Sequence, residues 1–162
     1  MQSENFKNQK IIFVSYKKYD ELFLKEKVFY KVIKMSFGDV IVVFSKIGIF
    51  EVLPVHFIEK IDFQKKEDVF PNVIYVKSTC FSQKVFKYIL KTRKGQLYSY
   101  SDVAININHP KAVRAVGLAL KKNPIFCFIP CHRIIYKNKK IGGYKWGEEL
   151  KLRLLQYEKS SL

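Results

Sequence analysis

Residues 109–135 read HPKAVRAVGLALKKNPIFCFIPCHRII, and this stretch decides the architecture of the second half of the chain. Its first part, 111–122, carries apolar residues at helical spacing on one face and basic residues on the other, which predicts an amphipathic helix. PIFCFI, residues 124–129, predicts a buried strand. This strand would deliver Cys131 and His132 either as a nucleophile and its base or as ordinary buried residues.

A shorter helix is expected just before the basic one. Ser99 is a suitable N-cap for a helix over residues 100–106, YSDVAIN, and His109-Pro110 interrupts the chain before the basic helix begins. Two short helices joined by a brief turn, the second with a basic outer stripe, are typical of a helix-turn-helix. A solvated helix face produces the same stripe, so the pattern alone leaves both interpretations open.

The last predicted helix, GEELKLRLLQYEK, places an acid among leucines. Glu158 falls on the same apolar stripe as Leu154 and Leu155. A carboxylate there must find a partner or raise its pKa, because an unpaired buried charge is costly. If Glu158 orients His132, then Cys131 gains the ordered base that a free thiol needs to act as a nucleophile.

The first part of the chain is rich in β-forming residues. VFYKVIKMSF and DVIVVFSKIGIFEVLPV are dense in Val, Ile and Phe, and Gly38-Asp39 suits a hairpin turn. A chain of 162 residues has room for two small domains. We expect an α+β or α/β fold with a β-rich N-terminal domain over 1–75 and a mostly helical C-terminal domain, carrying the helix-turn-helix, over 78–162.

The net charge points to a polyanionic partner. Thirty Lys and Arg against 14 Asp and Glu give +16. Nucleic acid is the natural candidate, because each neutralised phosphate releases condensed counterions. A generally lysine-rich composition would give the same excess, so charge alone does not decide the partner.

Other features of the sequence indicate where in the cell the protein is found and whether its cysteines form disulfides or a metal site. No apolar run approaches the roughly 20 residues that span a bilayer, and the first residues are polar, so we expect an intracellular protein, cytoplasmic or, in a eukaryote, nuclear. Cys80, Cys127 and Cys131 form no even set and no CxxC pair, which predicts neither a disulfide framework nor a zinc knuckle. Cys80 and Cys127 are interpreted as core residues.

Five features of the second half together resemble a known family. They are Pro-Cys-His-Arg at 130–133, Arg-Ala-Val-Gly at 114–117, Asn123-Pro124, Gly-Gly-Tyr at 142–144 and Leu-Leu-x-x-Glu at 154–158. In this order and spacing they closely resemble the 6-O-alkylguanine-DNA alkyltransferases, over Ser78 to Lys159. The β-rich first part is similar to the family's N-terminal domain in character only, and a ribonuclease H-like fold is what the resemblance implies for it.

The resemblance implies DNA repair in one irreversible step without a cofactor. An alkyl group passes from the oxygen of 6-O-alkylguanine to Cys131, and each molecule acts once because the thioether is not hydrolysed. His132 then acts as a base through a water, and Glu158 orients it. Such a reaction requires the damaged base to leave the DNA stack.

The resemblance also implies roles for residues around this centre. Asn123 ties the helix-turn-helix to the active-site strand, and Tyr100 donates a hydrogen bond to the base, with Tyr98 as the alternative. Arg114 enters the duplex and replaces the flipped base. The neighbouring residues implied to lie in the minor groove are Lys111, Ala112 and Ala115, and those implied for the guanine pocket are Ile134 (through its backbone), Tyr144 and Lys145.

The expected partner is therefore double-stranded DNA with an alkylated guanine, bound by a monomer. Some family members hold zinc in the N-terminal domain through cysteines and histidines, whereas residues 1–75 have His56 and no cysteine, so we expect no metal. Two alternatives remain. One is a protein that recognises alkylated DNA without repairing it, which would lack the cysteine, and the other is a cysteine hydrolase that turns over many times.

Overall fold

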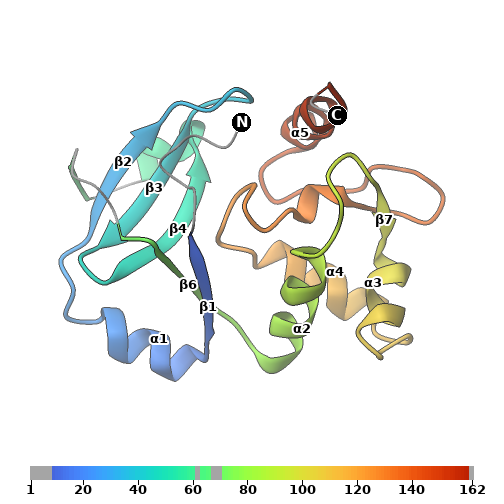
Figure 1. Cartoon of the computed structure of the whole chain (residues 1–162), viewed down its shortest axis with the longest axis horizontal. Coiled ribbons are helices and arrows are strands. Elements are labelled where there is room, and N and C mark those ends of the chain that lie inside the picture. Colours follow the sequence, from blue (N-terminus) through green and yellow to red (C-terminus); the bar gives the residue numbers. More distant parts are fainter. Residues whose placement is uncertain (1–8, 61–62, 67–70, 161–162) are drawn as a thin grey trace. The chain divides into compact units, whose positions relative to one another are not determined.

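The computed structural model describes residues 9–60, 63–66 and 71–160 of the chain (Figure 1). The backbone forms two compact units. In residue ranges, the first comprises Met1–Thr79 and Pro124–Phe126, and the second comprises Cys80–Asn123 and Cys127–Leu162. The first unit contains a mixed sheet and the second is mostly helical, so the expected class, a sheet combined with helices, is confirmed.

The first unit is built on a six-stranded sheet with the order β1-β6-β4-β3-β2-β5. The strands are antiparallel from β2 through β3 to β4, and parallel where β6 joins β4 and β1 and where β5 joins β2. The elements are β1 (Lys10–Val14), α1 (Tyr16–Phe23), β2 (Phe29–Ile33), β3 (Val40–Ser45), β4 (Gly48–Pro54), the 3₁₀ helix η2 (Val55–Lys60), β5 (Gln64–Lys65) and β6 (Val73–Lys77).

The central strand β3 organises the core of this unit. All six of its residues, VIVVFS, are buried, as expected for a strand covered on both faces. On one face, Ile41 and Val43 pack with Leu53 of β4. The connection from β2 turns at Gly38, whose φ of 128° suits glycine, so the predicted hairpin is confirmed.

Helix α1 was not expected from the sequence. Ser15 caps it by accepting a hydrogen bond from the Lys18 N–H at 3.2 Å. Phe23 packs against the sheet through Phe50 and Tyr75, with ring centroids 4.8 and 5.6 Å apart. The lysines in YKKYDELF mask this one-sided apolar contact in the sequence.

The predicted strand over 124–129 is wrong. Ile125 makes an isolated parallel bridge with Val52 of β4, flanked by hydrogen bonds from Val52 N–H to the Pro124 carbonyl and from Phe126 N–H to the Val52 carbonyl. Extension stops at Cys127, which has φ of 57° in the left-handed region. The chain then turns.

The second unit holds four helices and a two-stranded parallel sheet, within the part of the chain that the structure describes. None of the helices in the described residues is long and apolar enough to cross a bilayer. The elements are α2 (Cys80–Ile89), β7 (Tyr98–Ser99), α3 (Tyr100–Asn106), α4 (Val113–Lys121), the 3₁₀ helix η3 (Cys131–Arg133), β8 (Ile134–Ile135) and α5 (Glu148–Ser160).

Two details of these helices differ from expectation. Cys80 is exposed and does not belong to the core, because it lies on α2 opposite the buried face that includes Val85 and Phe86. Helix α4 begins at Val113, two residues later than predicted, because Ala112 takes the N-cap position. Its division into a buried and an exposed basic face is confirmed.

Helix α3 begins as the sequence predicts. The Ser99 hydroxyl accepts from the Asp102 N–H at 3.0 Å, and the Asp102 carboxylate accepts from the Ser99 N–H at 2.7 Å, which completes a capping box. The cap fixes the position of Tyr100, the first residue of the helix.

Ser99→Ala should lower the free energy of unfolding of the second unit by about 1 kcal/mol, because the Asp102 N–H at the start of α3 loses its hydrogen-bond acceptor. Urea unfolding followed by the fluorescence of Trp146, the sequence's single tryptophan, measures this loss. Ser99→Asn, which can still cap, is the matched control and should be close to wild type. Equal losses in both variants would contradict the capping role.

Candidate active site

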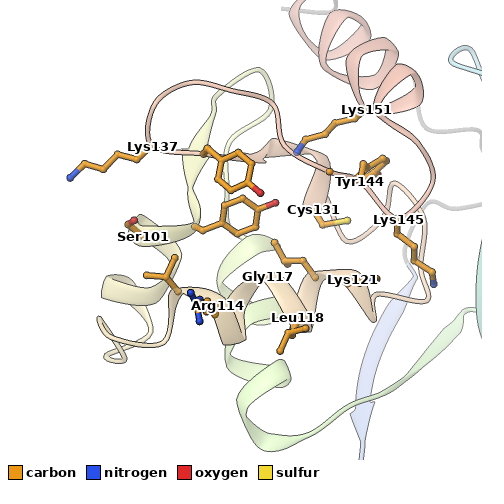
Figure 2. A pocket seen from close by; sticks show the side chains of 15 residues that line it. Ser101, Arg114, Gly117, Leu118, Lys121, Cys131, Lys137, Tyr144, Lys145 and Lys151 are labelled. Carbon is orange, nitrogen blue, oxygen red and sulfur yellow. The ribbon is translucent and has the colours of Figure 1, made fainter.

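Cys131 lies at the wall of an open cavity of about 990 Å³ that is lined by residues of α3, α4, η3, the chain before α5 and the start of α5 (Figure 2). It is the first residue of η3 and is only 4% exposed. The Asn123 side-chain amide donates to the Cys131 sulfur at 3.2 Å and to the Ile129 carbonyl at 3.1 Å. Asn123, two residues after α4 ends, therefore connects this helix to the turn that carries the thiol.

Burial raises the pKa of the Cys131 thiol above its ordinary value. The Asn123 amide, the Tyr144 hydroxyl and the positive charge of Lys151 act in the opposite direction without reversing it. The Tyr144 hydroxyl is buried, and Figure 2 shows its side chain next to Cys131. The resting sulfur is thus a protonated thiol at neutral pH, and it needs a base to react.

His132 and Glu158 form a buried pair behind the thiol. The His132 Nε2 and Glu158 Oε1 atoms are 3.0 Å apart, and the two side chains are 3% and 8% exposed. A carboxylate only accepts, so Nε2 carries the proton and Nδ1 is left as an acceptor. Nδ1 is buried and has no partner among the described residues. Burial lowers the pKa of His132, which keeps the imidazole neutral and able to take a proton.

Arg133 holds the Glu158 carboxylate, a contact that the sequence interpretation missed. Its Nη2 donates to Oε1 at 2.6 Å and its Nε to both oxygens at 3.0 Å, while Nη1 donates to the Thr92 carbonyl at 2.6 Å. The Gly95 N–H adds a bond at 3.2 Å. Although burial acts to raise it, these contacts with His132 and Arg133 bring the pKa of Glu158 down to about 2. The sequence did contain a signal for this contact, because a carboxylate on the apolar face of a helix needs a cation nearby.

Lys151 is a second buried cation that the sequence interpretation missed. Its ammonium donates to the carbonyls of Ile134 and Ile141 at 2.7 and 2.6 Å. Burial lowers its pKa to about 8. Figure 2 shows it reaching from α5 toward the cavity. The sequence indicated this burial, because Lys151 lies three and four positions before Leu154 and Leu155 and so falls on the same apolar stripe of the helix.

The structure brings most of the expected site residues to one cavity. Besides Cys131, the lining includes Tyr100, Arg114, Tyr144 and Lys145. The Lys145 ammonium, however, points away from the cavity and donates to the Asn123 carbonyl at 2.9 Å. Ile134 is buried, and its carbonyl accepts from Lys151.

The remaining candidates are not among the described residues that line the cavity. Lys111 precedes α4, Ala112 is its N-cap and Ala115 is half-buried on it. The Tyr98 hydroxyl donates to the Gln96 side chain at 3.0 Å, so Tyr98, the alternative to Tyr100, is engaged elsewhere.

The positive charge is concentrated in the half of the sequence that builds this cavity. Residues 80–162 contain 17 Lys and Arg against 4 Asp and Glu, whereas residues 1–79 contain 13 against 10. Lysine is equally frequent in the two halves, with 13 in each, so the difference comes from four arginines and from the smaller number of acids in the second half. The excess of positive charge therefore belongs mainly to the second half of the sequence, which favours a polyanion bound there.

The family model described as "6-O-methylguanine DNA methyltransferase, DNA binding domain" matches residues 80–160. A probable methylated-DNA–protein-cysteine methyltransferase of Acanthamoeba polyphaga mimivirus is 46% identical over 100 residues, which are 61% of this chain and 66% of the relative. The methylated-DNA–protein-cysteine methyltransferase of Haemophilus influenzae is 41% identical over 98 residues, 60% of this chain and 55% of the relative. The matches thus span about half to two thirds of these relatives.

Solved structures agree with this result. The O6-methylguanine methyltransferase of Mycobacterium tuberculosis superposes with a TM-score of 0.72 and 27% identity, over 83% of this chain and 94% of that protein. The same organism's protein in complex with DNA gives a TM-score of 0.69 at 27% identity, over 82% and 93%. The chain belongs to the 6-O-methylguanine DNA methyltransferase family.

Glu158 should make stability depend on pH in a defined window. Its pKa in the folded protein, about 2, lies below its ordinary value of 4.5, so its stabilisation is fully present above about pH 4.5 and is lost as the pH falls toward 2. A lowering of this size corresponds to up to about 3 kcal/mol. We expect the difference in unfolding free energy between wild type and Glu158→Gln to shrink over this window.

The control is Glu149→Gln, which removes an exposed acid paired with Arg153 at i,i+4. It should change the unfolding free energy little at any pH. If the difference in unfolding free energy between wild type and Glu158→Gln stayed constant from pH 6 to pH 2.5, the result would contradict a Glu158 that is charged in the folded protein.

Proposed function

We propose that this protein repairs alkylated DNA by moving the alkyl group from the oxygen of 6-O-alkylguanine onto the Cys131 sulfur. The sulfur–carbon bond forms as the oxygen–carbon bond breaks, and guanine is restored with the proton that the thiol gives up. No cofactor takes part. The supporting observation is the buried Cys131 thiol at the cavity wall, backed by the His132–Glu158 pair.

The proton path follows from the donors and acceptors around the sulfur. The unpartnered Nδ1 of His132 is the acceptor, and a bridging water would carry the Cys131 proton to it. The Glu158 carboxylate then stabilises the imidazolium that forms. Burial together with Tyr136 and Cys131 raises the pKa of Tyr100, so its hydroxyl stays protonated and able to donate to the guanine that leaves.

Recognition of DNA is assigned to α3 and α4 acting as a helix-turn-helix, with α4 in the minor groove. Arg114 is exposed on α4 and lines the cavity, so its side chain is available to fill the space of an extruded base. The residues assigned to contact the groove beside it are Lys111, Ala112 and Ala115. The DNA complex of the Mycobacterium tuberculosis relative supports this partner.

The guanine pocket is assigned to the Ile134 backbone, Tyr144 and the loop at Lys145. One lone pair of the Ile134 carbonyl accepts from Lys151, and the other is available to a ligand. In this proposal the C-terminal domain, 78–162, carries catalysis and DNA binding in a monomer. The N-terminal domain is assigned to the ribonuclease H-like class, which the combination of antiparallel and parallel strands supports.

The decisive experiment uses duplex DNA with a labelled methyl group on the guanine oxygen. Mass spectrometry of the protein should find the label on Cys131, at most once per molecule, and Cys131→Ser should reduce transfer to background. A protein that only recognises the lesion would bind the DNA and take up no label. A hydrolase would release labelled product many times per molecule, and either result would overturn the proposal.

Arg114→Ala should slow repair in duplex DNA by about tenfold or more, because an extruded base costs a few kcal/mol and its replacement is lost. Reaction with free 6-O-methylguanine should change little, since no duplex has to be opened. Lys122→Ala, which removes one exposed charge at the end of α4, is the matched control for electrostatics. Equal losses on both substrates would contradict the role of Arg114.

A further inference from the structure

Tyr136 lines the same cavity as Cys131 and has no role in the reaction described above. It directly follows β8, and its side chain is 51% exposed. Its backbone is held at both ends of a tight turn, because its N–H donates to the Lys140 carbonyl and its carbonyl accepts from the Lys139 N–H, both at 2.9 Å. A large aromatic residue is thus fixed at the cavity with half of its surface uncovered.

The ring of Tyr136 is confined by two neighbours. The Tyr100 ring lies 5.4 Å away between centroids, tilted by 45°. Gly142 approaches from another direction, and a Cβ at this position would lie 2.6 Å from the Tyr136 ring. Glycine is required there both for this approach and for its φ of 72°. The ring therefore cannot move toward Gly142 or Tyr100 when a ligand enters.

The cavity is larger than a methylated guanine requires. At about 990 Å³ it lies at the upper end of the range for small-molecule sites. Cys131, Tyr100 and Tyr136 all line this cavity, and the Tyr136 ring packs against the Tyr100 ring. A half-exposed aromatic ring in this place offers a surface against which a flat ligand group packs.

We propose that Tyr136 is a specificity-determining residue that contacts the alkyl group of the substrate and favours aromatic adducts, such as benzyl, over methyl. This inference rests on the proposed function. A benzyl ring gains contact with the Tyr136 ring as its methylene carbon reaches the sulfur, whereas a methyl group is too short to touch both. One aromatic contact of this kind is worth about 3- to 10-fold in rate.

The test compares two substrates in single-turnover reactions. Rate constants are measured for duplex DNA carrying 6-O-methylguanine or 6-O-benzylguanine, with wild type, Tyr136→Ala, Tyr136→Leu and Tyr136→Phe. The expected result is a benzyl-to-methyl rate ratio that falls about 3- to 10-fold in the Ala and Leu variants and is retained in the Phe variant. Both rate constants of a ratio come from the same protein preparation, so a misfolded fraction affects them equally and leaves the ratio unchanged.

Equal slowing of both substrates would overturn the proposal, because it would show that Tyr136 only supports Tyr100. An unchanged ratio with unchanged rates would overturn it as well. Leu152→Ala, on the exposed side of α5, removes a side chain of 41% exposure and should leave both rates at the wild-type value. Wild type that reacts with neither DNA would refute the proposed function itself, a distinguishable outcome.

Discussion

The carboxylate of Glu158 is the group on which the geometry of the site depends. It accepts hydrogen bonds from His132, from Arg133 and from the Gly95 N–H, so it joins η3, α5 and the chain between α2 and β7 at one point. Breaking a buried ion pair leaves an uncompensated charge and is costly. The same carboxylate also selects the tautomer of His132, the residue that follows Cys131. The stability of the second unit and the orientation of the His132 imidazole therefore depend on the same group.

The basic residues of the second half serve two different purposes. Arg133 and Lys151 are turned inward, where one balances an acid and the other is bound by backbone carbonyls. Most of the others are exposed, including Arg114 and Lys121 on α4. The inner pair shapes the site, while the outer set creates the positive field that attracts a polyanion and weakens with added salt.

Local and periodic signals in the sequence predicted the features that depend on near neighbours. The Ser99 cap and the place of Glu158 on an apolar stripe could be predicted because helix geometry fixes both. The strand over 124–129 could not be excluded, since an apolar run does not reveal the left-handed turn at Cys127. Arg133 was missed because His132 was already taken as the partner of Glu158, although a neutral imidazole does not balance the charge of a buried carboxylate.

Lys151 can lose its positive charge and still hold the two backbone segments that it connects. The ammonium has three N–H donors, and two carbonyls accept from it, those of Ile134 and Ile141. A neutral amine keeps two donors, so both bonds survive when the proton leaves near pH 8. The loop before α5 then stays attached to β8, while the positive charge that acts on Cys131 disappears. The loss of this charge removes one of the influences that lower the pKa of Cys131, while the hydrogen bonds that hold the loop remain.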